Sequence, residues 1–200
     1  MPAFRSAVGV LLLATAFAHA HYHMLLPSKH SVKAEEEVTF TYQFGHPFEH
    51  ELFNTAEPVA VYVYHPDGKN ETDVTKELKK TTVDGAEGKK VTAWTFTYTP
   101  PKRGDYTVVA FSPEFKLDGK EQKVRDVTKV VLHVQTENGW DIQVPKSEDS
   151  DLILLPLTRP YGLTPGTAFH VEAELRVPPD QRRLVGRGVV EVGKYNPTAP

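Results

Sequence analysis

Apolar and polar residues alternate along several short segments of the chain, with turn-forming residues between them. From Val38 to Phe44, apolar residues alternate with threonine and glutamine, which is the period-two pattern of a half-buried strand. Similar segments predict strands at residues 59–64, 91–99, 106–111 and 127–135. Turn sequences such as HPDG at 65–68 and PPKRGD at 100–105 separate them. The pattern predicts an all-β fold, an immunoglobulin-like β-sandwich, with at most one helical turn within residues 73–80.

A change in composition divides the chain after this sandwich. We assign residues 21–136 to the sandwich domain and the polar, turn-rich residues 137–151 to a linker. Residues 152–200 then form a second small β-unit, with strands predicted at 152–157, 168–177 and 188–192. About 50 residues make a thin independent core. The unit therefore packs on the sandwich, or it is incomplete because the chain shown is shortened.

The first twenty residues have the features of an export signal. Arg5 precedes an apolar stretch at residues 7–17, and the small residues Ala18 and Ala20 follow. The stretch is shorter than the roughly 20 residues that span a bilayer. We therefore predict a signal peptide at 1–20, cleaved after Ala20, and a periplasmic or secreted protein. A retained membrane anchor is one alternative. Cleavage after Ala18, which would make His19 the first residue and His21 the third, is another.

Composition excludes several kinds of chemistry. The chain has no cysteine and a formal net charge of −3. Thiolate metal sites are therefore excluded, and no basic patch indicates a nucleic-acid partner. The sequence contains no nucleophile elbow, no phosphate-binding glycine loop and no HExxH motif. We predict a protein that is not an enzyme.

The nine histidines are unevenly placed, and they suggest a metal site. Cleavage after Ala20 would make His21 the first residue and His23 the third. In a four-nitrogen clamp, the free amine, two backbone amides and the His23 imidazole would bind Ni(II) or Cu(II) in a plane. In a brace, the amine and ring of His21 would bind the metal together with one more imidazole. The candidates for that imidazole are His23, His46, His50 and His133.

The sequence leaves the clamp and the brace open, although an extended strand at 21–25 would favour the brace. Glu49 and Glu51 lie next to His46 and His50, where they could orient an imidazole by accepting its N–H. A solvated acidic loop is the alternative interpretation of these four residues. His133 falls on the strand face opposite the apolar residues Val130, Leu132 and Val134.

Several motifs give the sequence a resemblance to a known family. They are AHAHYHMLLP at 18–27, FGHPFE at 44–49, VYHPDG at 63–68, RGDY at 103–106 and TRPYGLTPG at 158–166. In order and spacing, the chain resembles the bacterial periplasmic nickel-uptake substrate-specific family, also classified as a domain of unknown function.

The resemblance implies a periplasmic β-sandwich that delivers nickel or cobalt to an inner-membrane uptake transporter. It also implies that the mature N-terminus, a nearby histidine and a further histidine of the domain hold the metal. Carried over, these positions fall on His21 and His23, with His46 as the first candidate for the third. The expected ion is Ni(II) or Co(II), with Cu(II) as a further candidate.

Two other functions are compatible with the sequence. A metal-free cell-surface structural or adhesion module would need none of these histidines. A copper monooxygenase of polysaccharides would use His21 with His133, but the sequence lacks disulfides and an evident flat aromatic platform for carbohydrate.

Overall fold

A computed structural model describes residues 21–46, 51–116, 121, 123–135, 152–164, 166–176 and 182–184. The predicted signal peptide at 1–20, the linker at 137–151 and the strand at 188–192 lie outside the described residues. Glu49 and His50 also lie outside them. Within the described residues, no helix is long and apolar enough to cross a membrane.

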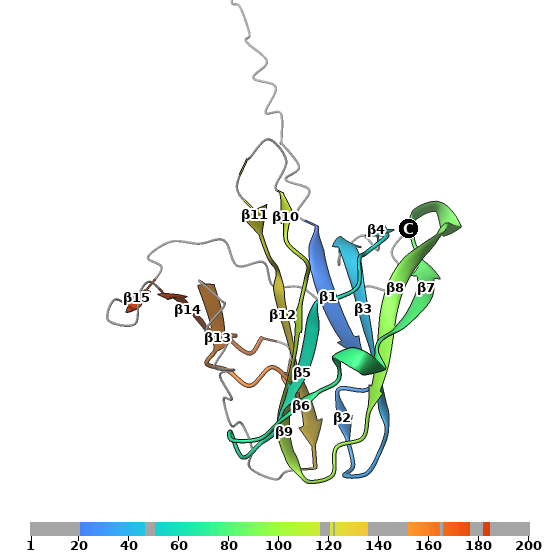
Figure 1. The fold of residues 1–200 in the computed structure, drawn as a ribbon. Helices are drawn as coiled ribbons and strands as arrows, with labels where there is room; N and C mark the ends of the chain where they lie inside the picture. Colours follow the sequence, from blue (N-terminus) through green and yellow to red (C-terminus); the bar gives the residue numbers. More distant parts are fainter. Residues whose placement is uncertain are drawn as a thin grey trace, which may run out of the picture.

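The first sheet of the fold is antiparallel and has the strand order β1-β3-β8-β7 (Figure 1). These strands are β1 (Tyr22–Pro27), β3 (Val38–His46), β8 (Lys90–Tyr98) and β7 (Lys79–Asp84). The pairing of β3 with β8 ends at Tyr42. Beyond that point a short strand, β4 (Glu51–Phe53), pairs with the end of β3 instead. The end of β3 therefore has β1 on one side and β4 on the other.

The second sheet has the order β2-β12-β9-β5-β6. Its strands are β2 (Ser31–Val32), β12 (Val127–Val134), β9 (Gly104–Phe111), β5 (Ala60–Tyr64) and β6 (Glu71–Asp73). Strand β2 runs parallel to β12, and the other pairs are antiparallel. A hairpin of β10 (Phe115–Lys116) and β11 (Lys123–Val124) connects β9 to β12.

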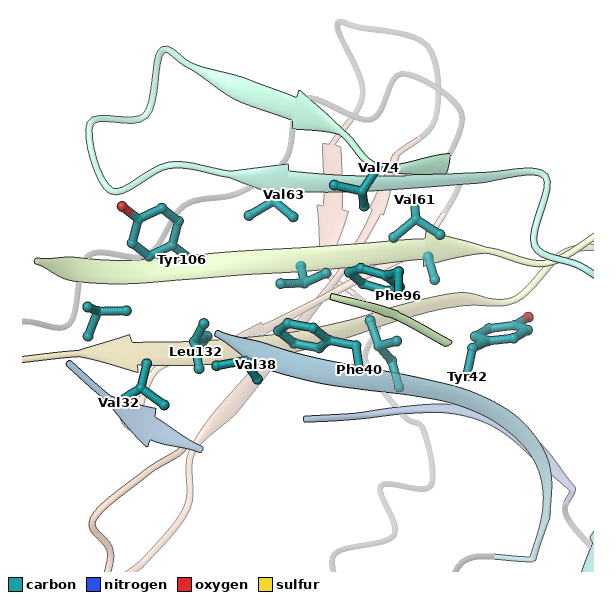
Figure 2. Packing of buried hydrophobic residues seen from close by; sticks show 14 residues of the cluster. Val32, Val38, Phe40, Tyr42, Val61, Val63, Val74, Phe96, Tyr106 and Leu132 are labelled. Carbon is teal, nitrogen blue, oxygen red and sulfur yellow. The ribbon is translucent and has the colours of Figure 1, made fainter. Parts of the chain in front are cut away.

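The main hydrophobic core contains buried residues from both sheets (Figure 2). The apolar side chains of β3 alternate into it, and the Phe40 ring stacks on Phe96 of β8 with centroids 5.0 Å apart. From the second sheet, Val63, Val108 and Leu132 join the same cluster. The predicted all-β sandwich is confirmed, because period-two alternation places one face of each central strand in a shared core.

The predicted strands of the sandwich are present, but β7 was missed. Its sequence, KKTTVD, contains one apolar residue, Val83, and the strand lies at the edge of its sheet. Lysine-rich edge strands bury little surface, so they give a weak hydrophobic pattern. The helical turn allowed within residues 73–80 corresponds to the 3-10 helix η1 (Thr75–Glu77), and a second one, η2 (Ala86–Gly88), lies in the β7–β8 turn.

A three-stranded antiparallel sheet follows the sandwich in the sequence. It contains β13 (Leu152–Pro156), β14 (Val171–Arg176) and β15 (Arg182–Leu184). The strands predicted at 152–157 and 168–177 are therefore present as β13 and β14. The connection between them carries Tyr161, which reaches the sandwich, as described below.

Candidate metal centre

The start of β1 brings His21 next to His46. Tyr22 pairs with Gly45 in the β1–β3 register, so His21, one residue earlier, lies across from His46 at the end of β3. Their ring centroids are 6.4 Å apart and the ring planes are nearly perpendicular, at 86°. Two imidazoles that share a metal through bonds of about 2.0–2.1 Å have centroids about 4.5–6.5 Å apart. The observed separation therefore fits a shared ion with a wide nitrogen–metal–nitrogen angle.

Two phenylalanine rings lie against the His21 ring of this pair. The His21 ring meets Phe53 edge to face with centroids 4.9 Å apart, and Phe44 lies 6.0 Å away. His46 itself is buried, with 8% of its surface exposed. An apolar wall of this kind holds imidazole rings in place and excludes water from one side of a site.

Gly45 allows β4 to approach this end of β3. A Cβ atom at Gly45 would lie 2.1 Å from the carbonyl oxygen of Glu51 and 2.8 Å from the Cα of Leu52. The φ angle of Gly45 is +154°, which is uncommon for other residues. The same pairing places Glu51 directly opposite His46. Residues opposite each other in a ladder project to the same side, so Glu51 lies on the same side of the sheet as His46. Its role in orienting that imidazole stays a prediction.

His23 is held separately, by a carboxylate from the other side of the sandwich. Its Nδ1 donates a hydrogen bond of 2.7 Å to Oδ2 of Asp126, because a carboxylate only accepts. The His23 ring stacks on Tyr42 with centroids 5.2 Å apart and lies 4.7 Å from Phe44. Sequence analysis missed Asp126, which is 103 positions from His23 and belongs to no local motif.

The Tyr42 hydroxyl is buried beside this pair. Among the described residues it has no hydrogen-bond partner. Burial raises the pKa of Tyr42, and the negative charge of Asp126 raises it further. Tyr42 is therefore neutral at physiological pH, and it provides His23 with an aromatic surface.

His133 lies on the outer face of the second sheet, as its position opposite Leu132 and Val134 predicted. It pairs with Asp105 in the β9–β12 register, and its Nδ1 donates to Oδ1 of Asp105 at 2.7 Å. The Tyr161 hydroxyl donates to Oδ2 of the same carboxylate at 2.6 Å, and its ring stacks on His133. Asp105 is almost fully buried in this cluster. The cluster attaches the 157–164 segment to the sandwich.

The structure does not bring His133 and His21 together. Thr128 of β12 donates a hydrogen bond to the His23 carbonyl, and this contact marks the end of β12 nearest to His21. His133 is five residues farther along the strand, a distance of about 17 Å at the usual rise. Its imidazole also lies on the face turned away from the core. A brace of His21 with His133 is therefore not supported by the geometry.

The local geometry favours the brace over the clamp. The clamp requires residues 21–23 to wrap around the ion with deprotonated amides and a free His23 imidazole. In the structure, Tyr22 and His23 are instead extended and paired with β3. The Nδ1 of His23, which closes the chelate ring of a clamp, is bonded to Asp126.

The side chains alone do not complete a metal site. Across the described parts of the chain, no group of three or more histidine, aspartate or glutamate side chains is placed to hold an ion. His21 and His46 supply two imidazoles. Cleavage after Ala20 would add the α-amine of His21 as a third nitrogen donor next to them.

Comparison with known proteins identifies one relationship. A family model described as a domain of unknown function, DUF4198, matches residues 18–175. A search of curated proteins finds no match. The matched region begins three residues before His21, and it includes His21, His46 and the Asp105–His133–Tyr161 cluster.

Proposed function

The chain belongs to the DUF4198 family, and within that family we propose that it is an exported protein that binds a transition-metal ion. The ion is Ni(II), Co(II) or Cu(II), and its ligands are the α-amine and ring of His21 and the ring of His46. The protein is not an enzyme; it binds the metal for uptake or delivery.

One observation carries the proposal. The predicted first residue of the processed chain lies opposite His46, and the 6.4 Å between the two ring centroids is compatible with a shared ion. Imidazole and amine nitrogens are ligands that these borderline ions prefer. His46 is held at the end of a sheet strand, so one of the two imidazoles is already ordered, which reduces the ordering cost of binding.

The role in uptake rests on the resemblance to the nickel-uptake family and on the predicted signal peptide. A protein exported to the periplasm would meet metal ions before they reach the inner membrane. An inner-membrane uptake transporter is accordingly the proposed recipient of the ion.

The proposal is tested by adding one residue before His21. The processed chain, beginning at His21, and a chain extended by one alanine are titrated separately with Ni(II), Co(II) and Cu(II). The extension converts the amine into an amide and moves the free amine away from His46. We expect affinity for the preferred ion to fall by at least about 100-fold, more than the 10–100-fold typical of groups that only orient a ligand.

The control is a processed chain in which exposed His30 is replaced by alanine, and it should bind as the wild type does. Equal affinity of the processed and extended chains would refute the amine as a ligand. No stoichiometric binding by the processed chain would favour the metal-free adhesion module instead.

A further inference from the structure

The first residue of a chain is hard to hold in place. Chain ends fray unless specific contacts fix them. After cleavage, His21 would precede β1 by one residue, and Tyr22 is partly exposed. A metal site that uses the terminal amine therefore depends on whatever fixes the next few residues.

The side chain of His23, the third residue of the processed chain, is held on several sides. Its side chain is 10% exposed, and it lies against Tyr42, Phe44 and Phe115. Its Nδ1 donates to Asp126, and its carbonyl accepts a hydrogen bond of 3.3 Å from Thr128. Asp126 lies just before β12 and Thr128 lies at its start; β12 belongs to the second sheet, whereas β1 pairs with β3 of the first sheet. The His23 contacts therefore join the start of β1 to both sheets.

Asp126 is itself fixed by backbone contacts. Its amide donates to the Ser112 hydroxyl at 2.9 Å, and its carbonyl accepts from the Ser112 amide at 3.0 Å. Ser112 is fully buried. The carboxylate thus extends from a fixed position just before β12, beside Ser112 at the end of β9, and it holds His23 in one ring orientation.

We infer that Asp126 is a positioning residue of the metal centre: by holding His23, it places the terminal amine of His21 beside His46. This inference rests on the proposed function. Asp126 would not contact the ion. It would raise the population of chains whose first residue is in the binding position, and apparent affinity scales with that population.

The substitution Asp126→Asn should change metal affinity in opposite directions for the clamp and for the brace. Asp126→Asn removes the charged acceptor of the His23 N–H. If the metal is bound in a brace, the start of β1 frays and affinity falls. If it is bound in a clamp, the substitution releases the His23 Nδ1 that the clamp needs, and affinity rises.

The test measures metal affinity and amide hydrogen exchange in the processed chain, with Ni(II) and Cu(II) as probes. Breaking a hydrogen bond to a charged group changes an equilibrium by roughly 10–100-fold. In Asp126→Asn we expect metal affinity to fall about 10-fold or more. Without metal, the amides of His23 and Met24 should exchange about 10-fold faster or more, while Val108 and Leu132 stay protected.

Two further variants keep the result interpretable. The His23→Gln/Asp126→Asn double variant should bind metal no more weakly than His23→Gln alone. Both substitutions break the same hydrogen bond, so their effects should not add. Glu114→Gln, which removes a negative charge from the loop after β9, should leave affinity unchanged. A similar loss in Glu114→Gln would mean that negative charge in this region, and not the Asp126–His23 hydrogen bond, sets the affinity, and it would overturn the inference.

Unchanged or tighter metal binding by Asp126→Asn would overturn the inference, as would unchanged exchange at His23 and Met24. Failure of the proposed function would be seen separately, as absence of metal binding by the unsubstituted processed chain. The exchange measurement needs no metal, so it tests whether Asp126 holds the start of β1 in place independently of the proposed function.

Discussion

Replacing His46 with glutamine should lower the metal affinity of the processed chain by at least about 100-fold, while the chain stays folded. Glutamine keeps a polar side chain of similar length, but its amide is a poor ligand for borderline ions compared with imidazole. Loss of a direct ligand should exceed the 10–100-fold effect of losing a group that orients one. Affinity is measured by competition with a chelator, and folding by thermal unfolding.

The comparison variant is His23→Gln. If the brace is correct, this substitution loosens the start of β1 and lowers affinity less than His46→Gln does. The clamp requires the reverse order, with His23 essential and His46 dispensable. Full affinity in His46→Gln would remove His46 from the site.

Replacing Gly45 with alanine should destabilise the fold and the metal centre together. The new Cβ would meet the Glu51 carbonyl oxygen at 2.1 Å, so β4 must move away from β3. We expect the free energy of unfolding to fall by more than about 2 kcal/mol, because backbone strain and steric overlap add. Metal affinity should also fall, since His46 is the next residue. Denaturant unfolding and metal titration measure the two effects.

Gly88→Ala is the matched control for Gly45→Ala. Gly88 also has a positive φ, +69°, but a Cβ there would meet no atom within 4 Å. Gly88→Ala should lower the free energy of unfolding by about 1 kcal/mol, because only the positive φ angle opposes the alanine side chain. If Gly45→Ala were no more harmful than Gly88→Ala, the close approach of β4 to β3 would not support this end of the sheet.

The sandwich was predictable because its central strands bury one face each. From Val38 to Phe44 the alternation is regular, and the first three of its apolar residues, Val38, Phe40 and Tyr42, belong to the core in the structure. The edge strand β7 was not predictable, because its lysines and threonines give little hydrophobic contrast. The short strand β4 was also missed, since a three-residue strand is too short to show a period.

The candidate site was only partly predictable. The A-x-A pattern and the histidines after it pointed to His21. The pairing register of β1 with β3 was needed to choose His46 over His133, because the sequence does not show which residue lies opposite His21. Asp126 and Tyr161 act across 103 and 56 positions, respectively. No local pattern links residues so far apart.

X-ray absorption spectroscopy of the metal-loaded, processed chain tests the central claim most directly, because multiple scattering counts the imidazole rings bound to the ion. We expect two imidazoles and one further nitrogen, with one imidazole lost in His46→Gln. A single imidazole in the unsubstituted chain, or two that persist in His46→Gln, would contradict a centre made by His21, its amine and His46.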